Sequence, residues 1–450
     1  MFRKITVDLL QWSAQSDRKP LVLKGARQVG KTWLVRDLAN KLNLQLLELN
    51  FERDPKLKNL FGDNDPKKTL LQMEVFFNRN INPHETLLFL DEIQAAPEIF
   101  SKLRWFAEEL PELAVIATGS LLDFMQQKYA ISMPVGRIQY LYLEPMSFEE
   151  FLLAIGQNKV YDFLANYQLT EKIPNILHEK LQQLLREYMF VGGMPAIVAN
   201  WAQNKSFLQV SAGQQNVLTI YRDDFAKYAK LAVQQCLDEV FSGIPRFLGK
   251  KFKYSAINRD LPSIVLKNAL NLLCKARVCH KVYACSGNGI PLEANIKENL
   301  FKVIMLDVGL VSAAMGITAP MINVDQLRLI NEGGIAEQLV GQLLRVVAPK
   351  FLEPKLYYWV REKIGAEAEI DYLLQFNTQI IPVEVKSGST GTLRSLHVFM
   401  QERGLTKAIR FNADYPSVVA VNVKNNAGQA IEYTLLSLPM YLTEQVHRLL

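Results

Sequence analysis

The sequence predicts an α/β protein built from several domains. Apolar runs alternate with helical patterns from Leu21 to Leu143, which is typical of a parallel sheet flanked by helices. A mostly helical stretch follows, and residues 331–450 return to an α/β pattern. A chain of 450 residues is also too long for one hydrophobic core. We therefore expect four parts, at residues 1–145, 146–240, 241–325 and 326–450.

The composition is that of a globular protein, with 49% hydrophobic and 21% charged residues. No apolar run approaches the roughly 18 residues that a membrane-spanning helix needs. No long apolar segment follows Met1–Lys4, as it would in a secretory signal. Four cysteines in a chain of this length do not make a disulfide framework. These features predict a cytoplasmic protein without a membrane partner.

A phosphate-binding loop follows the first apolar run, Leu21–Lys24, which is expected to be a strand. The pattern G-x-x-x-x-G-K-[ST] of the P-loop is formed by Gly25, Ala26, Arg27, Gln28, Val29, Gly30, Lys31 and Thr32. Its glycines let backbone N–H groups approach phosphate, Lys31 reaches the β- and γ-phosphates, and Thr32 can bind Mg²⁺. A helix predicted over 31–42 would add its N-terminal dipole. The alternative is a glycine-rich turn with a surface lysine.

A second motif, Asp91-Glu92, ends the apolar strand predicted over Thr86–Leu90. Beside a P-loop, Asp91 would hold Mg²⁺ directly or through water, and Glu92 would polarise the attacking water. The strand predicted over Leu44–Asn50 lies between the two motifs, as in P-loop ATPases that carry their own catalytic glutamate. A buried strand followed by an exposed acidic turn is the alternative. The loop upstream favours a site that binds and hydrolyses ATP.

Polar residues also follow the strand predicted over Leu113–Thr118. Thr118 or Ser120 could sense the γ-phosphate or orient the water, although Ser120 is also suited to cap the next helix. Arg137 precedes the last strand, predicted over Ile138–Leu143, and could neutralise phosphate charge in a neighbouring subunit. Such a role implies a homo-oligomer through the ATPase core. The alternative for this arginine is a surface ion pair with Glu144, Glu149 or Glu150.

Together these motifs resemble the prokaryotic AAA-type ATPases that carry an appended C-terminal domain of unknown function. The resemblance rests on GARQVGKT, FLDEIQ, TGS and LEPMSFEEF, and continues through YMFVGGMPA, MLDVGL and EVKSG. It implies an AAA core with strand order 5-1-4-3-2 that uses ATP and Mg²⁺. It also implies a helical lid that moves with the nucleotide state.

The lid would occupy residues 146–240, where apolar spacing predicts helices over Glu179–Tyr188 and Phe207–Lys230. Gly192-Gly193-Met194-Pro195 interrupts the helical pattern and must form a tight turn. This turn is either the joint of the lid or a structural turn between packed helices.

A winged-helix arrangement is predicted within residues 241–325. Helices are expected over Tyr254–Leu261 and Ser263–Lys275, followed by a strand over Arg277–Cys285. Ser286–Gly289 then has the composition of a hairpin turn. Winged helices contact nucleic acid, and they also serve as protein-contact or spacer modules.

One segment, Arg246–Lys281, carries a charge of +8, which more than accounts for the net charge of +6 of the whole chain. It holds nine Lys and Arg residues against one acid, Asp260. Such a cluster favours a polyanionic partner, DNA or RNA. The candidate contacts are Lys250, Lys251, Lys253, Arg259, Lys267, Lys275, Arg277 and Lys281.

The C-terminal part is expected to contain a helix over Gly333–Val346 and strands over Leu356–Val360, Glu369–Leu374 and Ile380–Lys386. Glu384 and Lys386 would project to the same face of one strand, and a hairpin would bring Asp371 beside them. Two carboxylates can hold Mg²⁺ while the lysine activates a water against a phosphodiester. This constellation resembles the restriction-endonuclease-like nuclease core, and Glu337 matches the acid that many such cores add to the metal site. The alternative is a nuclease-like fold without an active metal site.

The sequence supports two main hypotheses. The first is an ATP-driven enzyme that acts on DNA or RNA. The second is a nucleotide-dependent switch whose C-terminal fold binds a partner without cutting. For the core, a protein-remodelling ATPase is the remaining alternative.

Overall fold

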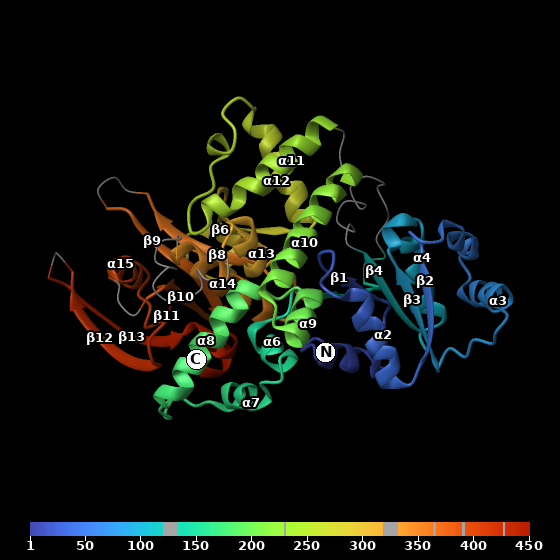
Figure 1. Cartoon of the computed structure of the whole chain (residues 1–450), viewed down its shortest axis with the longest axis horizontal. Coiled ribbons are helices and arrows are strands. Elements are labelled where there is room, and N and C mark those ends of the chain that lie inside the picture. Colours follow the sequence, from blue (N-terminus) through green and yellow to red (C-terminus); the bar gives the residue numbers. More distant parts are fainter. Residues whose placement is uncertain are drawn as a thin grey trace.

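The computed structural model describes residues 1–119, 134, 136–228, 231–317, 332–362, 366–388, 392–425 and 428–450. It is elongated, with a parallel sheet at one end, a larger mixed sheet at the other, and helices between them (Figure 1). One buried hydrophobic cluster runs through all three layers, from Leu23 in the first sheet through Leu185 in the helices to Val383 in the second sheet. No helix among the described residues is long and apolar enough to cross a membrane.

The first sheet has five strands in the order β2-β3-β4-β1-β5, and all neighbours pair in parallel. The strands are β1 (Leu21–Lys24), β2 (Gln45–Asn50), β3 (Thr86–Asp91), β4 (Ala114–Gly119) and β5 (Gln139–Tyr142). The expected order 5-1-4-3-2 is confirmed, and each predicted strand is present with its ends within one residue. Every residue of β1, β3 and β4 is buried, as in a sheet covered on both faces.

Helices flank this sheet: α1 (Thr6–Ser13), α2 (Lys31–Leu42), α3 (Pro66–Phe77) and α4 (Ile99–Glu109). The predicted helix over 31–42 is confirmed. It begins directly after Gly30, whose φ of 93° lies in the left-handed region that glycine adopts without strain. Leu34 and Leu38, one turn apart, bury one face of α2 in the core. The N-terminus of α2 therefore lies directly after the phosphate-binding loop.

The helices between the sheets are α6 (Phe148–Ala154), α7 (Asn158–Asn166), α8 (Asn175–Val191), α9 (Pro195–Asn204), α10 (Phe207–Tyr228), α11 (Leu231–Gly243), α12 (Ser263–Lys275) and α13 (Val308–Ala314). The turn between α8 and α9 is buried. The Gly193 N–H donates to Asp307 Oδ2 at 2.6 Å, and a Cβ at Gly193 would lie 2.0 Å from the Met146 carbonyl oxygen. This close packing supports a structural turn between packed helices.

The second sheet has eight strands in the order β12-β13-β11-β10-β9-β8-β6-β7. They are β6 (Cys279–Cys285), β7 (Ile296–Met305), β8 (Leu356–Arg361), β9 (Ala368–Phe376), β10 (Gln379–Val385), β11 (Lys407–Asn412), β12 (Ser417–Lys424) and β13 (Ala430–Pro439). Its helices are α14 (Glu332–Val347), α15 (Arg394–Arg403) and α16 (Val446–Leu449). The helix and the three strands predicted around Glu337, Asp371 and Glu384 are all present.

The predicted winged helix is not confirmed as a separate module. Its hairpin, β6–β7, joins the second sheet, because β6 pairs in parallel with β8 through Val282 and Leu356. The boundary expected at residue 325 therefore runs through one continuous sheet. Alternating apolar residues predicted the strand correctly but could not show which neighbour it pairs with.

One predicted helix, Tyr254–Leu261, is wrong. Only a single 3₁₀ turn, Tyr254–Ala256, forms there. The Asn258 side chain accepts the Asp260 N–H at 2.8 Å, which gives the backbone a turn in place of a helix. Pro262 further disfavours helical backbone at the residue before it.

Candidate functional site

The P-loop connects β1 to α2, as the motif requires. Gly25 packs so closely that a Cβ there would lie 2.6 Å from the Leu143 carbonyl oxygen. Lys31 is buried, and its Nζ donates to the carbonyl oxygens of Gly25 at 3.0 Å and Ala26 at 2.8 Å. Burial lowers the pKa of Lys31 to about 8, against the opposing effect of nearby carboxylates. An anion bound in the loop would compensate this buried charge.

Asp91 is the centre of a polar cluster at the carboxyl ends of the strands. Its Oδ2 accepts from the Thr32 hydroxyl at 3.2 Å and from Asn50 Nδ2 at 3.1 Å, and its Oδ1 accepts from the Thr118 hydroxyl at 2.5 Å. The structure thus brings three of the predicted residues together. Asn50 was missed, although its place at the end of β2, opposite Asp91 in register, could have indicated it.

Glu92 lies beside this cluster and lines the pocket over the loop. Its backbone is left-handed, with φ of 52°, and the chain leaves β3 at this residue. The Gln94 amide donates to the Glu92 carboxylate. Gln94 therefore orients the carboxylate predicted to polarise water, and the sequence had given it no role.

The other residues predicted to act at the nucleotide site, Thr118, Ser120 and Arg137, do not all lie at the pocket. Thr118 contacts Asp91, whereas Ser120 lies outside the described residues. Arg137 is half exposed, and its Nε forms an ion pair with Glu108 Oε1 at 2.6 Å. The expected ion-pair partners were Glu144, Glu149 and Glu150, but all three are buried. Arg137 does not line the nucleotide pocket of its own chain.

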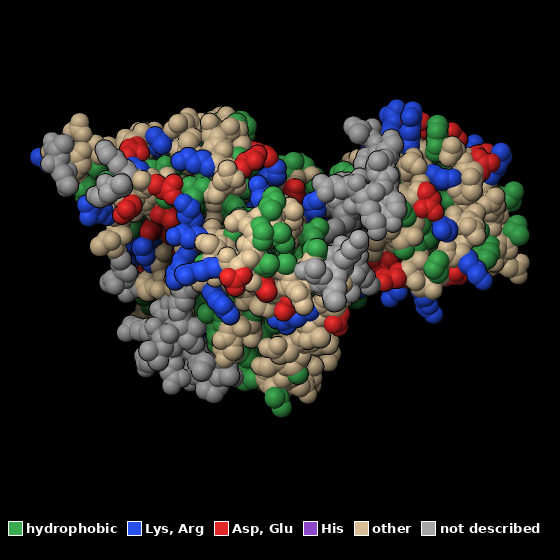
Figure 2. Space-filling view, turned by 90° about the horizontal axis from the view of Figure 1, so that it is seen from above, with side chains coloured by type: hydrophobic (Ala, Val, Ile, Leu, Met, Phe, Trp, Pro, Cys, Tyr) green, Lys and Arg blue, Asp and Glu red, His purple; other side chains and the backbone are tan. Residues whose placement is uncertain are grey.

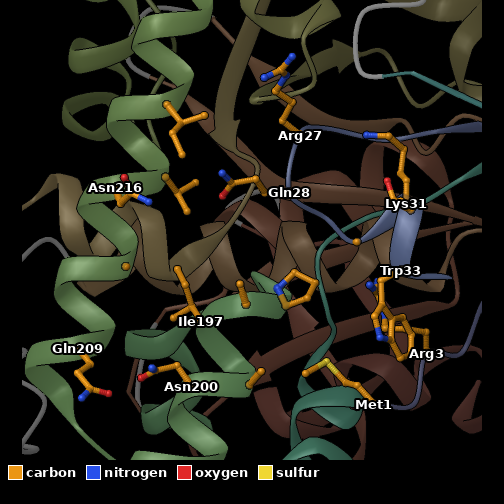
Figure 3. Close-up of a pocket in the computed structure, with 18 of the residues that line it drawn as sticks. Met1, Arg3, Arg27, Gln28, Lys31, Trp33, Ile197, Asn200, Gln209 and Asn216 are labelled. Atoms are coloured by element: carbon orange, nitrogen blue, oxygen red, sulfur yellow. The ribbon is translucent and has the colours of Figure 1, made fainter. Parts of the chain in front are cut away.

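A cavity of about 760 Å³ lies between the P-loop and the helices α9 and α10. Figure 3 shows Arg27 and Lys31 on the loop side, and Ile197, Asn200, Gln209 and Asn216 on the helical side. Helix α10 also binds the loop directly. The Tyr221 hydroxyl donates to the Arg27 carbonyl at 2.9 Å, and Arg27 Nε lies 3.0 Å from Asp224 Oδ2. The helices predicted as a lid therefore form one wall of the pocket.

A buried ion-pair network joins the first sheet to the C-terminal half. Glu144, directly after β5, lies 2.9 Å from Arg345 and 3.4 Å from Arg277, measured between Oε1 and Nη2. These cations hold the pKa of Glu144 well below its usual range, against the opposing effect of burial. Arg277 was predicted to contact nucleic acid. That prediction is wrong, because its side chain is buried in this network and also pairs with Glu353.

The other predicted nucleic-acid contacts fall into two groups. Lys251 pairs with Glu362 at 2.5 Å, Lys281 donates to Asn271 at 2.6 Å, and Lys275 is half-buried with a partner of its own. Four are exposed: Lys250, Lys253, Arg259 and Lys267. Figure 2 shows the face on which α11 and α12 lie, with Lys and Arg side chains across its C-terminal half and acidic side chains among them.

The C-terminal candidates also come together. Asp371 on β9 lies across the hairpin from β10, where its Oδ2 accepts the Val385 N–H at 2.7 Å. Glu384 on β10 pairs with Lys386 at 2.5 Å. Burial and the charge of Asp371 raise the pKa of Glu384 to about 7, and burial and Asp371 likewise raise the pKa of Glu337 to about 8.

A buried lysine that the sequence did not indicate sits among these carboxylates. Lys302 Nζ, from β7, lies 3.0 Å from Glu337, 2.5 Å from Glu369 and 3.7 Å from Asp371. Burial alone would lower the pKa of Lys302, but the three carboxylates raise it well above its usual value. Among the described residues, no group of three His, Cys, Asp or Glu side chains could hold a metal ion. An ammonium group therefore lies between Glu337 and Asp371, where the sequence predicted Mg²⁺.

Three family models match successive parts of the chain. Residues 17–152 match an AAA domain. The P-loop and Asp91-Glu92 lie within this AAA domain. Residues 182–321 match a domain of unknown function, DUF8612, and residues 332–440 match another, DUF4143.

Several solved structures are similar to the chain at 12% sequence identity. The RuvB Holliday junction branch migration motor of Thermotoga maritima has a TM-score of 0.30, with 63% of this chain and 90% of that chain covered. The Orc2 protein of Aeropyrum pernix has a TM-score of 0.29, with 70% and 91% covered. DnaA of Aquifex aeolicus has a TM-score of 0.26, with 60% and 86% covered. No curated protein matches the chain.

Proposed function

We propose that this protein binds ATP with Mg²⁺ at the P-loop of its AAA domain and hydrolyses it. One observation carries the proposal. The buried Lys31 ammonium, the Thr32–Asp91 pair 3.2 Å apart and the Glu92 carboxylate all lie at one edge of the pocket. Cation, oxygen ligands and base are the groups that phosphoryl transfer to water requires.

The residues present fit a magnesium ion. The Thr32 hydroxyl and the Asp91 carboxylate are hard oxygen donors on adjacent elements, and they would hold it. When bound, Mg²⁺ neutralises charge on the β- and γ-phosphates. Asn50 and Thr118 keep the Asp91 carboxylate in place through their hydrogen bonds.

Each residue then has a defined part in hydrolysis. Lys31 and the backbone N–H groups of the loop bind the phosphates. Glu92, oriented by Gln94, takes the proton of the attacking water. The water oxygen forms a bond to the γ-phosphorus, the bond from that phosphorus to the bridging oxygen breaks, and ADP leaves with the electron pair.

The test is the ATPase rate of the wild type beside Lys31→Ala and Glu92→Gln. Lys31→Ala should lose nucleotide binding. Glu92→Gln should retain binding and lose turnover, because its amide cannot accept the proton. Turnover that survives in both variants would overturn the proposal. Single- and double-stranded DNA or RNA added to the wild type shows whether nucleic acid changes the rate.

Arg137 is proposed to act on a neighbouring subunit in a homo-oligomer. Its half-exposed side chain lies on the AAA domain outside its own pocket, which supports a contact in trans. Arg137→Ala should then lower the turnover of the assembled protein without changing nucleotide affinity. Arg104→Ala, which removes another surface partner of Glu108, is the matched control and should leave turnover unchanged.

Contact with DNA or RNA is proposed for the four exposed basic residues. If they bind phosphate, nucleic-acid affinity should fall steeply as salt rises. Charge removal at Lys250 and Lys253 should reduce that salt dependence by about one counterion per lysine. An affinity unaffected by salt or by these changes would instead point to a protein client, as in a remodelling ATPase.

For the C-terminal region, Lys302 favours the second hypothesis, a nucleotide-dependent switch that does not cut. A restriction-endonuclease-like fold is supported by the order α14, β8, β9, β10, α15, β11, with Asp371 and Glu384 on adjacent strands. An ammonium nevertheless lies between Glu337 and Asp371, two of the three carboxylates predicted to hold Mg²⁺. We expect no Mg²⁺-dependent cleavage of plasmid or linear DNA. Cleavage that is lost in Asp371→Ala and Lys386→Ala would establish the nuclease instead.

A further inference from the structure

Arg3 lies outside every motif, yet it contacts the P-loop itself. Its side chain is 4% exposed, and all three nitrogens of its guanidinium donate hydrogen bonds. Nη1 donates to the Val29 carbonyl at 3.0 Å, Nη2 to the Glu144 carbonyl at 2.7 Å, and Nε to Glu150 Oε2 at 3.1 Å. Figure 3 shows Arg3 in the wall of the pocket.

The contact with Val29 fixes a peptide group of the P-loop. A trans peptide points its carbonyl and its N–H in opposite directions, so the Val29 carbonyl and the Gly30 N–H are oriented together. Gly30 has φ of 93°, and glycine tolerates the rotation that would reverse this peptide. Reversal would turn a carbonyl oxygen toward the phosphates. The charged hydrogen bond from Arg3 holds the carbonyl outward, and it polarises the peptide so that Gly30 becomes a stronger donor.

The other end of this contact reaches the C-terminal half of the chain. Glu150 also accepts the Lys4 N–H at 2.5 Å, and Lys4 Nζ lies 2.7 Å from Glu149 and 2.6 Å from Glu444. Glu444 belongs to the last turn before α16. Residues 3 and 4 therefore join the nucleotide loop to a segment more than 400 residues away in the sequence.

The second acceptor of Arg3 has a similar connection. It is the backbone carbonyl of Glu144, whose carboxylate is held by Arg345 and Arg277. The position of Arg3 thus depends on two glutamates, Glu150 and Glu144. The C-terminal half holds the Glu144 carboxylate directly, and it contacts Glu150 through Lys4.

We propose that Arg3 is a positioning residue for nucleotide binding, which orients the Val29–Gly30 peptide toward the phosphates and couples nucleotide affinity to the seating of the C-terminal half. The proposal rests on the proposed ATP site. It predicts that loss of Arg3 weakens the binding of phosphate-bearing nucleotide while the groups that carry out hydrolysis remain in place.

The test compares Arg3→Gln and Arg3→Lys with Arg18→Gln in the full chain. Arg18 is a matched control, because it also donates to two carbonyl oxygens, those of Ser13 and Glu112, but does not line the pocket. Affinity is measured with a fluorescent ATP analogue and with ADP, both with Mg²⁺, well below the melting temperature. Arg3→Gln should raise Kd and KM about tenfold or more, with kcat within about twofold. Arg18→Gln should leave Kd and KM within about twofold of wild type.

If Arg3→Gln fails to fold, Arg3→Lys still allows nucleotide affinity to be measured. One ammonium cannot serve three acceptors arranged around a planar guanidinium, so affinity should fall to an intermediate value. Amide hydrogen exchange in segment 25–32 should be faster in Arg3→Lys and unchanged in the Arg18 variant.

Lys31→Ala distinguishes a failure of the proposed role of Arg3 from a failure of the proposed ATP site. Suppose that Lys31→Ala loses nucleotide binding but both Arg3 variants bind nucleotide as the wild type does. That result would overturn the role of Arg3 and leave the ATP site standing. Lys31→Ala with wild-type affinity would overturn the ATP site and the role of Arg3 with it. A fall in melting temperature without any change in Kd would show that Arg3 is only structural.

Discussion

Two buried lysines, one in each half of the molecule, are held in opposite ways. Lys31 in the P-loop donates to two carbonyl oxygens, and burial lowers its pKa to about 8. Lys302 in the C-terminal sheet faces three carboxylates, which raise its pKa despite burial. The first ammonium keeps its charge for an incoming anion, whereas the second is neutralised within the fold. The two lysines therefore differ in what balances their charge, which is neutral carbonyl oxygens around Lys31 and carboxylates around Lys302.

The largest contrast should appear in stability without nucleotide. Lys302→Met would leave three carboxylates facing one another without their cation, and a broken buried ion pair of this kind costs about 3–5 kcal/mol. Lys31→Met would remove an ammonium that is costly to bury, so stability should be unchanged or higher. Urea unfolding of the two variants measures both effects. Equal losses of stability in the two variants would show that the two lysines do not differ in this way.

Nucleotide affinity should show the reverse order. Lys31→Met should bind ADP about 100-fold more weakly, because it removes the charged contact between a buried ammonium and the phosphates. A soluble variant that neutralises part of the C-terminal cluster, Glu384→Gln, should bind ADP as the wild type does. Calorimetric titration of both variants gives the two values. A comparable loss in Glu384→Gln would mean that the two sites share one ligand.

The pH dependence of binding gives a smaller effect with a defined sign. Below pH 8, Lys31 is already charged and binds the anion without taking up a proton. Above its pKa of about 8, binding has to take up a proton, so ADP affinity should fall by up to about tenfold per pH unit. Titrations between pH 7 and 9.5 test this, with Lys31→Met as the control that should lose the dependence. An affinity that rises with pH would exclude a charged Lys31 as the phosphate ligand.

The smallest effect is expected at Lys386, the other lysine of the C-terminal cluster. Its side chain is 28% exposed and pairs with Glu384. Lys386→Met should cost about 1 kcal/mol, less than Lys302→Met, because the Lys386 side chain is partly exposed to water although its partner Glu384 is buried. A loss as large as that of Lys302→Met would show that the cluster needs both lysines, and that Lys302 is not its dominant cation.

The parts of the fold that depend on neighbouring residues could be predicted from the sequence. The P-loop, Asp91-Glu92 and the five strands of the first sheet each follow from a short local pattern. Asp371 and Glu384 could be placed together because a hairpin joins their strands. These features were found because their geometry is set within a few residues of the motif.

The contacts made across the sequence could not be predicted. Lys302 joins carboxylates on α14 and β9, and Arg3 reaches the P-loop from outside any motif. Arg277 shows the same limit in reverse. Arg277 belongs to a basic segment, so its side chain was predicted to be exposed. In the structure it is buried and pairs with Glu144, which is more than 100 residues away in the sequence. Charge along the sequence does not reveal which charges are paired.

The network around Glu144 also bears on how such a protein can be divided or recombined. A fragment that ended with the AAA domain at residue 152 would keep the Glu144 carboxylate and lose both of its arginines. It would also open to water the side of the first sheet that shares a hydrophobic cluster with the rest of the chain. The AAA domain and the C-terminal half therefore form one structural unit, and we expect residues 1–152 alone to be less stable than the full chain.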